Sequence, residues 1–247
     1  MKPTVVIFSG AGLSAESGVP TFRDSNGLWE NHRVEDVATP EGWRRDKELV
    51  LKFYEQRFHG VRNCEPNAAH KAIAQLQEKF HVINITQNID DLLERAGVDK
   101  IFHLHGSIFQ RKCEKHTSCS NPNRYSCDYL VEHDTPVKKG DMCPKCGAQL
   151  RPNVVWFGES VDMREDYLHD LLIYNLSKDG IFIVVGTSAQ VWPAAGLIEM
   201  FRSVPYKYII DKNPPKHPNN YTILEGNAGE ELPKLVEQLL NDNYKND

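Results

Sequence analysis

The stretch VVIFSGAGLSA, residues 5–15, is the most informative segment of this 247-residue chain for its fold class. Its first half, Val5–Phe8, is a short β-branched and aromatic run, which is typical of a buried strand. Its second half, Gly10–Ala15, has the spacing G-x-G-x-x-A, and small residues after a strand let the backbone approach a pyrophosphate. The stretch predicts a strand and a dinucleotide-binding loop, although a tight strand-to-helix turn has the same appearance.

Similar apolar runs along the chain predict further strands. They are Val82–Ile85, Ile101–Leu104, Val154–Phe157, Ile181–Val185 and Tyr208–Ile210. Helical patterns lie between most of them, with Asn67 as a predicted N-cap, Gly97 as a predicted helix end and an amphipathic helix over Leu232–Leu240. Buried strands that alternate with helices predict an α/β fold, a Rossmann-like doubly wound parallel sheet that binds ligands at its carboxyl edge.

Two stretches interrupt this alternation. Residues 24–70 are loop-rich and then helical, and residues 111–152 are polar, turn-rich and contain five of the six cysteines. We expect both to form a smaller helical and zinc-binding insert domain, inside one catalytic domain over residues 1–247. The Rossmann-like core then comprises residues 1–23, 71–110 and 153–247.

Composition narrows the class of protein. The 29 basic and 34 acidic side chains give a net charge of -5, and no dense basic run is present, which argues against nucleic acid as the main partner. The beginning of the chain lacks the pattern of a secretory signal, and no stretch is long and apolar enough to cross a membrane. We therefore expect a cytoplasmic protein whose clustered cysteines bind metal; the oligomeric state is not indicated.

The predicted loop differs from that of a hydride-transfer enzyme. A dehydrogenase places an acidic residue at the tip of a second strand, roughly 20 residues beyond the loop, to hold the adenine ribose. Here no apolar strand follows until Val82, and Glu30, Glu35 and Asp36 lie in a loop-like stretch. This difference favours chemistry on NAD itself.

A longer stretch, GAGLSAESGVPTFR at residues 10–23, resembles the opening motif of the sirtuins. Further segments resemble sirtuin motifs in the family's order: Thr86–Asp90, His103–Gly106, Phe157–Glu159, Gly186–Ser188 and Val191–Pro193. The resemblance implies an enzyme that uses NAD as co-substrate to remove acyl groups from protein lysine, releasing nicotinamide and 2'-O-acyl-ADP-ribose. Acylated lysine on proteins or peptides is the implied substrate.

The resemblance also implies roles for individual residues. His105, directly before glycine, is the implied general base for a ribose hydroxyl, with His103 as the competing candidate, and an imidazole suits this role because its pKa lies near neutrality. Asn88 is the second implied catalytic residue, with a helix N-cap as its structural alternative. The implied NAD contacts are Gly10, Ala11, Gly12, Glu16, Phe22, Arg23, Gln87, Asn88, Ile89, Asp90, Gly186, Thr187, Ser188, Asp211, Asn213 and Ala228. At Asp211 and Asn213 the sequence departs from the family, which carries Asn first and an acidic residue third.

Tyr54 and Arg57 are three residues apart in a helical pattern and share a face. An Arg fork grips a carboxylate in a bidentate manner, although an Arg on a helix is more often a solvated surface charge. The pair resembles the tyrosine-arginine motif of the sirtuin branch that removes succinyl and malonyl groups, and acetyl groups remain possible substrates. The implied substrate contacts are Tyr54, Arg57, Ala38, Phe157, Gly158 and Val191, the last three in loops that clamp a peptide as an added strand.

The cysteines predict a structural zinc site without a catalytic part. Cys143 and Cys146 form a C-x-x-C pair, and we choose Cys113 and Cys119 as the other two ligands. Cys127 and His116 stay open as alternatives for the last position, and unliganded reduced thiols are the alternative to a metal.

Two other functions fit the same motifs. One is an NAD-consuming ADP-ribosyltransferase or glycohydrolase, which has no need of Tyr54 and Arg57 on one face. The other is a regulator that binds NAD or ADP-ribose and releases no nicotinamide.

Overall fold

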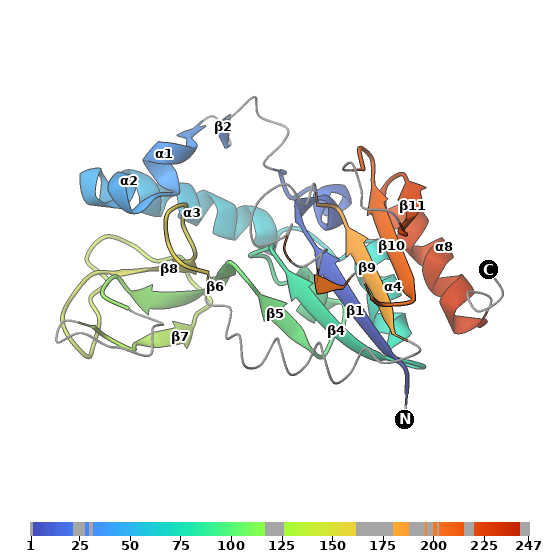
Figure 1. Cartoon of the computed structure of the whole chain (residues 1–247). Coiled ribbons are helices and arrows are strands. Elements are labelled where there is room, and N and C mark those ends of the chain that lie inside the picture. The colour runs from blue at the N-terminus through green and yellow to red at the C-terminus, as the bar shows by residue number, and fades with distance from the viewer. Residues whose placement is uncertain are drawn as a thin grey trace.

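A parallel sheet of six strands carries the larger part of the fold in this computed structural model, which describes residues 2–21, 28–29, 32–116, 126–161, 180–187, 196, 200–201, 203–214 and 220–242 (Figure 1). The strand order is β11-β10-β9-β1-β4-β5. The strands are β1 (Thr4–Ser9), β4 (His81–Thr86), β5 (Ile101–His103), β9 (Ile181–Val185), β10 (Tyr206–Asp211) and β11 (Thr222–Glu225). This is the predicted Rossmann-like order, and the chain reverses its direction of winding between the neighbouring strands β1 and β9.

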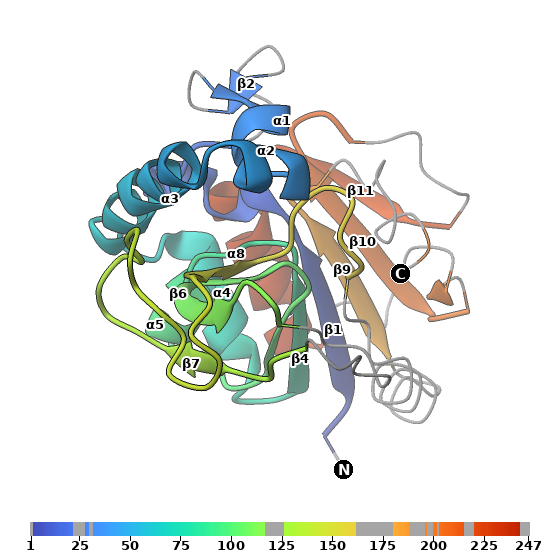
Figure 2. The ribbon, with the colours of Figure 1, turned by 90° about the vertical axis from the view of Figure 1, so that its left-hand side faces the viewer.

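The residues of β1 explain why it lies at the centre of the sheet. Side chains alternate between the faces of a strand. Val5 and Ile7 therefore pack with the helices α4 (Ala68–Leu76) and α8 (Ala228–Leu240), which lie together on one face (Figure 2). Val6 and Phe8 pack on the opposite face, in a cluster that includes Phe201. All four β1 side chains are fully buried, as expected for a strand in a parallel sheet covered on both faces.

The helix boundaries follow the predicted signals. The Asn67 side chain accepts hydrogen bonds from the Ala69 and His70 amides at the start of α4, and the His70 ring accepts one from the Asn67 amide. After the short helix α5 (Leu92–Arg95), Gly97 has a φ of +89°, a conformation that favours glycine at a helix end. Both predictions are confirmed.

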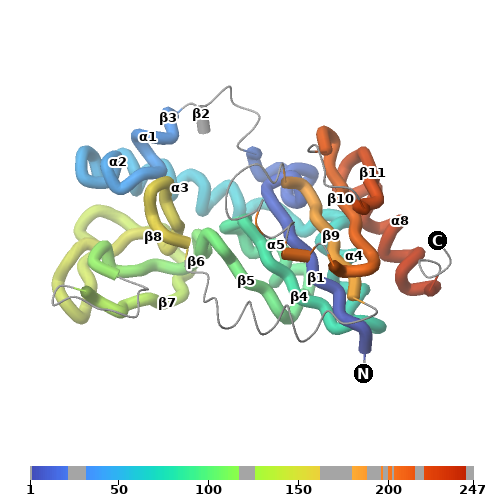
Figure 3. The backbone as a smooth tube through the Cα atoms, in the orientation of Figure 1, coloured from blue at the N-terminus to red at the C-terminus, as the bar shows by residue number. Residues whose placement is uncertain are grey.

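A smaller group of elements stands beside the sheet. It contains the helices α1 (Val34–Val37), α2 (Pro40–Arg45) and α3 (Lys47–Arg62), the short strands β2 (Leu28–Trp29) and β3 (His32–Arg33), and an antiparallel sheet β7-β6-β8 formed by β7 (Leu130–Glu132), β6 (Gly106–Cys113) and β8 (Leu150–Val154). The tube in Figure 3 shows α3 beside β6 and β8, which come much later in the chain. One apolar cluster joins them, with Phe53, Ile108 and Leu150 among its members.

The prediction of a parallel strand over Val154–Phe157 is wrong. The strand is β8, which ends at Val154 and pairs antiparallel with β6 in the small sheet. Val154 and Trp156 are buried against the small group of elements and not in the large sheet, so an apolar run alone did not identify its partner. The sixth strand of the large sheet is β11, whose half-exposed side chains form no comparable apolar run.

No helix in the described ranges is long and apolar enough to cross a membrane.

Candidate functional site

The loops after β1 and β9 touch each other at the point where the winding reverses. The loop after β1 forms two short 3-10 helices, Ala11–Leu13 and Ala15–Ser17. The Gly12 amide donates to the Gly186 carbonyl oxygen at 2.9 Å, and a Cβ on Gly12 would lie 2.6 Å from the Gly186 Cα. The glycine at position 12 is therefore required by the contact between the two loops, in addition to any close approach of a pyrophosphate.

Two predicted NAD residues from different loops meet across this edge. The Thr187 hydroxyl donates to the Gln87 side-chain oxygen at 2.9 Å, and the Gln87 amide donates to the Ser9 carbonyl at 2.9 Å. Thr187 is also buried. The carboxyl ends of β1, β4 and β9 are thus tied together by polar groups, at the position where doubly wound sheets bind dinucleotides.

The Ser14 hydroxyl joins the predicted residues Asn88 and Asp90 in a buried network. It donates to the Asp90 carboxylate at 3.0 Å and accepts from the Asn88 side-chain amide at 3.0 Å. His70 Nε2 lies 3.4 Å from the same hydroxyl, and since its Nδ1 accepts from the Asn67 amide, Nε2 carries the proton. Burial lowers the pKa of His70 to about 4, so this ring is neutral. Sequence reasoning missed Ser14 and His70, although Ser14 lies within the glycine-rich motif.

Asp90 is held by this network and by the start of α5. Its other carboxylate oxygen accepts from the Leu92 amide at 3.2 Å. Burial raises the pKa of Asp90, and the bonds from Leu92 and Ser14 act against this rise. The N-cap of α5 is Asp91, so the alternative interpretation of Asn88 as that cap is wrong.

The two candidate histidines have different surroundings. His105 Nδ1 lies 2.9 Å from the Gln87 carbonyl oxygen and donates to it, which leaves Nε2 as the basic nitrogen. Burial lowers the pKa of His105, so the neutral base persists below the usual imidazole range. His103 instead has a hydrogen-bond acceptor at each ring nitrogen, the Asn88 carbonyl and the Glu94 carboxylate, both at 2.7 Å. Its pKa is raised, since Glu94 outweighs the effect of burial, and such a ring is a poor base.

Several residues predicted to contact NAD, in the loop after β1, at the end of β10 and at the start of α8, form hydrogen bonds or pack within the protein. The Glu16 carboxylate accepts from the Gly229 amide at 2.6 Å, at the N-terminus of α8, where negative charge is favourable. Ala228, the first residue of α8, is buried. The Asp211 carboxylate accepts from the Asn213 amide at 2.8 Å. The roles predicted for these residues toward the nucleotide stay predictions.

Tyr54 and Arg57 both lie on the buried side of α3, at 1% and 6% exposure, so the solvated-surface interpretation of Arg57 is wrong. The Tyr54 oxygen accepts from Trp156 Nε1 at 3.1 Å, which directs its own hydroxyl proton elsewhere. Burial raises the pKa of Tyr54, and the bond from Trp156 and the positive charge of Arg57 act against this rise, so the phenol is neutral.

The segment Val155–Phe157 connects the histidine to the predicted substrate residues. The Val155 amide donates to the His105 carbonyl at 2.9 Å, and the Phe157 amide donates to the Ala38 carbonyl at 3.0 Å. Between them, Trp156 donates to Tyr54. Ala38 is buried, while Phe157 is 53% exposed and precedes Gly158 in a turn.

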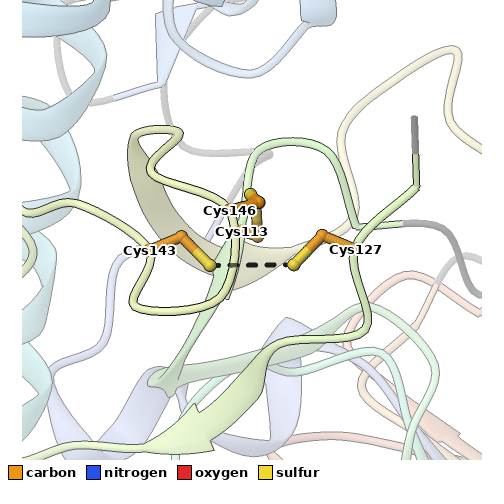
Figure 4. Close-up of side chains that lie close together, drawn as sticks. All are labelled: Cys113, Cys127, Cys143 and Cys146. Atoms are coloured by element: carbon orange, nitrogen blue, oxygen red, sulfur yellow. Dashed lines mark hydrogen bonds between the residues drawn. The ribbon is translucent and has the colours of Figure 1, made fainter.

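Four thiols converge in the small group of elements (Figure 4). They belong to Cys113, Cys127, Cys143 and Cys146, and all lie within 4.8 Å of one another. The Cys113–Cys146 and Cys127–Cys143 sulfur separations are 3.4 and 3.7 Å, close to the roughly 3.8 Å between thiolates around tetrahedral zinc. The four thiols fit structural zinc, with Cys127 in the place for which we chose Cys119; this is a correction of the ligand set.

Five predicted site residues lie outside the described residues. They are Phe22, Arg23, Cys119, Ser188 and Val191.

Comparisons with known proteins cover most of the chain and agree with one another. The family model SIR2, described as the Sir2 family, matches residues 10–193. An NAD-dependent protein deacylase of Shewanella oneidensis is 40% identical, over 97% of this chain and 96% of its own length. One of Pyrococcus furiosus is 42% identical, over 95% and 92%. Among solved structures, a Sir2 homologue in complex with NAD has a TM-score of 0.77 at 38% identity, covering 98% of this chain and 91% of its own. A mutant Sir2 homologue in complex with ADP-ribose has a TM-score of 0.79 at 38% identity, over 98% and 93%.

Proposed function

Since the chain belongs to the Sir2 family, we propose that it is an NAD-dependent protein deacylase that prefers succinyl- and malonyl-lysine and also accepts acetyl-lysine. The deacylase activity is that of its relatives, and NAD is the co-substrate. NAD supplies the ribose that receives the acyl group when its bond to nicotinamide breaks. The reducing environment that four clustered thiols require supports a cytoplasmic location.

We assign the chemistry to residues at the carboxyl ends of β4 and β5. Asp90 and the Ile89 backbone hold the nicotinamide carboxamide, and Asn88 assists cleavage while its side chain is oriented by Ser14. His105 Nε2 removes a proton from a ribose hydroxyl, since its Nδ1 is occupied by Gln87. Gln87 orients the ribose through a side chain that Thr187 holds in place.

The observation that carries the acyl preference is the connection made by Val155–Phe157. One segment bonds to the carbonyl of His105, to the phenol of Tyr54 and to the backbone of Ala38, which supports an acyl pocket beside the base. Arg57, buried beside Tyr54, keeps its positive charge, because a guanidinium does not lose its proton in proteins. A carboxylate at the end of the acyl chain matches this charge.

The test is to incubate the protein with NAD and matched acetyl-, succinyl- and malonyl-lysine peptides, following nicotinamide and deacylated peptide by mass spectrometry. We expect Arg57→Met to lower kcat/KM for the succinyl peptide about 30-fold, since a lost charge-assisted bond is worth about 2 kcal/mol. Deacetylation should change far less. Arg62→Met, an exposed arginine at the end of the same helix, is the matched control.

Equal losses for acetyl and succinyl peptides would refute the role of Arg57. Nicotinamide release that does not depend on the peptide would instead favour a glycohydrolase or ADP-ribosyltransferase. Nucleotide binding without nicotinamide release would favour a regulator.

A further inference from the structure

His103, the last residue of β5, lies between two hydrogen-bond acceptors. Its Nδ1 is 2.7 Å from the Asn88 carbonyl oxygen, and its Nε2 is 2.7 Å from a carboxylate oxygen of Glu94 on α5. A carbonyl can only accept, so Nδ1 carries a proton, and the second proton on Nε2 pairs the ring with Glu94. The His103 side chain is only 16% exposed. The ring is therefore a buried imidazolium with both protons engaged.

The charges around His103 favour this state. Burial by itself lowers the pKa of His103, but the bond and charge of Glu94, the Asn88 carbonyl and the charge of Asp90 raise it overall. These acidic groups face the ring from α5 and from the loop after β4. Burial raises the pKa of Glu94, whereas the bond from His103 and its charge lower the pKa overall, so the partner is an anion.

This arrangement determines the orientation of one peptide group in the site. A trans peptide is planar, and its carbonyl and amide point in opposite directions. When His103 holds the Asn88 carbonyl, the Ile89 amide must point away from His103. Two residues further along the chain, His105 holds the carbonyl that precedes Asn88, that of Gln87, at 2.9 Å. The two histidines thus hold consecutive carbonyls of the loop after β4.

We propose that His103 is a positioning residue: paired with Glu94, it fixes the Asn88–Ile89 peptide that presents the Ile89 amide to the nicotinamide carboxamide. The inference rests on the proposed function, which assigns the carboxamide to this backbone and to Asp90. His103 acts through the peptide and does not itself touch the nicotinamide.

The test compares His103→Gln and Glu94→Gln with two controls, His81→Gln and Glu65→Gln. His81 lies at the opposite end of β4, and Glu65 pairs with Arg95 on the exposed side of α5. We expect the nicotinamide inhibition constant to rise, and the rate of nicotinamide exchange to fall, about tenfold or more in both test variants. Small misplacements of a group that binds the substrate have effects of this size. The KM for the acyl peptide should stay unchanged. In a protein that already carries His103→Gln, Glu94→Gln should cause no further change in the nicotinamide inhibition constant or the exchange rate. The reason is that the Glu94 carboxylate acts only through the His103 imidazolium.

If His103 had only a structural role, its replacement would lower the fraction of folded protein. The nicotinamide inhibition constant and the KM for the acyl peptide would then keep their ratio, and that result would overturn the proposal. So would losses no larger than those of the two controls. If the wild-type protein releases nicotinamide normally and His103→Gln does not alter its inhibition constant, the inference fails while the proposed function stands.

If the wild-type protein releases no nicotinamide with any acyl peptide, the proposed function fails, and nuclear magnetic resonance of the His103 ring nitrogens still decides the hydrogen-bonded arrangement. Two protonated nitrogens at about pH 7 support it. A ring that loses a proton below pH 6.5, the ordinary value, contradicts it.

Discussion

His103 and His105 are two residues apart and of one type, yet their surroundings give them opposite properties. Glu94 keeps a proton on His103, whereas burial disfavours the second proton on His105. The sequence, through its family resemblance, implies the residue before Gly106 as the base, and the direction of the His105 pKa supports this prediction. It could not assign a role to His103, because Glu94 approaches it only in the folded chain.

The direction of the His105 pKa shift predicts the acid side of the pH profile. The active form of the base is neutral, and burial favours that form in the folded protein, so activity should persist as the pH falls through 6.5 and decline only below it. The same shift makes folding stability decrease as the pH falls below 6.5, since the unfolded chain then binds the proton more readily.

Measurement of kcat/KM for formation of the deacylated peptide across this range checks the prediction. An acid limb centred at or above 6.5 would contradict it. Replacing His105 by Gln should lower kcat about 100-fold or more and remove the limb, because general bases contribute about 10²- to 10⁴-fold.

Among the elements, the loops after β1 and β9 show how a sequence motif can have two physical causes. Glycine spacing predicted a phosphate-binding loop, and the structure adds that Gly12 lies against Gly186 with no room for a Cβ. Segment Val154–Phe157 shows the opposite case. Val154 and Trp156 are buried, but in the apolar cluster that includes α3 and β6 residues and not in the large sheet, and Phe157 is exposed.

The loop contact predicts the effect of one methyl group. A Cβ at Gly12 would lie 2.6 Å from the Gly186 Cα, so Gly12→Ala must push the two loops apart. We expect a loss of about 1–3 kcal/mol in the free energy of unfolding, as for other overpacked sites, together with weaker NAD binding. Denaturant unfolding and calorimetric NAD titration measure the two effects.

Gly60→Ala is the matched control, because a Cβ at this position in α3 would meet no atom within 4 Å from the rest of the described chain outside its own helix. It should stabilise the protein by about 0.5–1 kcal/mol, the usual cost of glycine within a helix. If Gly12→Ala left the free energy of unfolding unchanged, the two loops would be able to separate without loss of stability, and the prediction would be wrong.

For the whole molecule, the zinc site connects the small group of elements to the catalytic edge. Strand β6 begins at Gly106, directly after the base, and ends at the zinc ligand Cys113. The next residue, Glu114, accepts a hydrogen bond from Trp43 Nε1 at 3.0 Å and forms an ion pair with Lys47. These two interactions attach α2 and the start of α3 to the end of β6. A zinc ion held by these thiols would therefore stabilise the elements that carry Ala38, Tyr54 and Arg57, at a distance from the chemistry.

This connection predicts different effects for two cysteines. Cys127→Ser should remove zinc and lower both the thermal midpoint and deacylation, because a site that lacks one thiolate loses much of its binding free energy. Cys119→Ser should keep zinc near one ion per chain. Metal analysis of both purified variants decides the ligand set, and a metal-free Cys119→Ser protein with a zinc-loaded Cys127→Ser protein would reverse our assignment.

The family, the doubly wound sheet and the positions of the main site motifs could be predicted from the sequence, because glycine spacing and buried apolar runs are local properties of the chain. The tertiary structure alone decided that Cys127 completes the thiol cluster, that Val154 belongs to the small sheet, and that Ser14 joins Asn88 to Asp90. Each of these depends on a partner far away in the chain. A local pattern specifies that a side chain is buried or polar, whereas the packing of distant elements selects the group that it contacts.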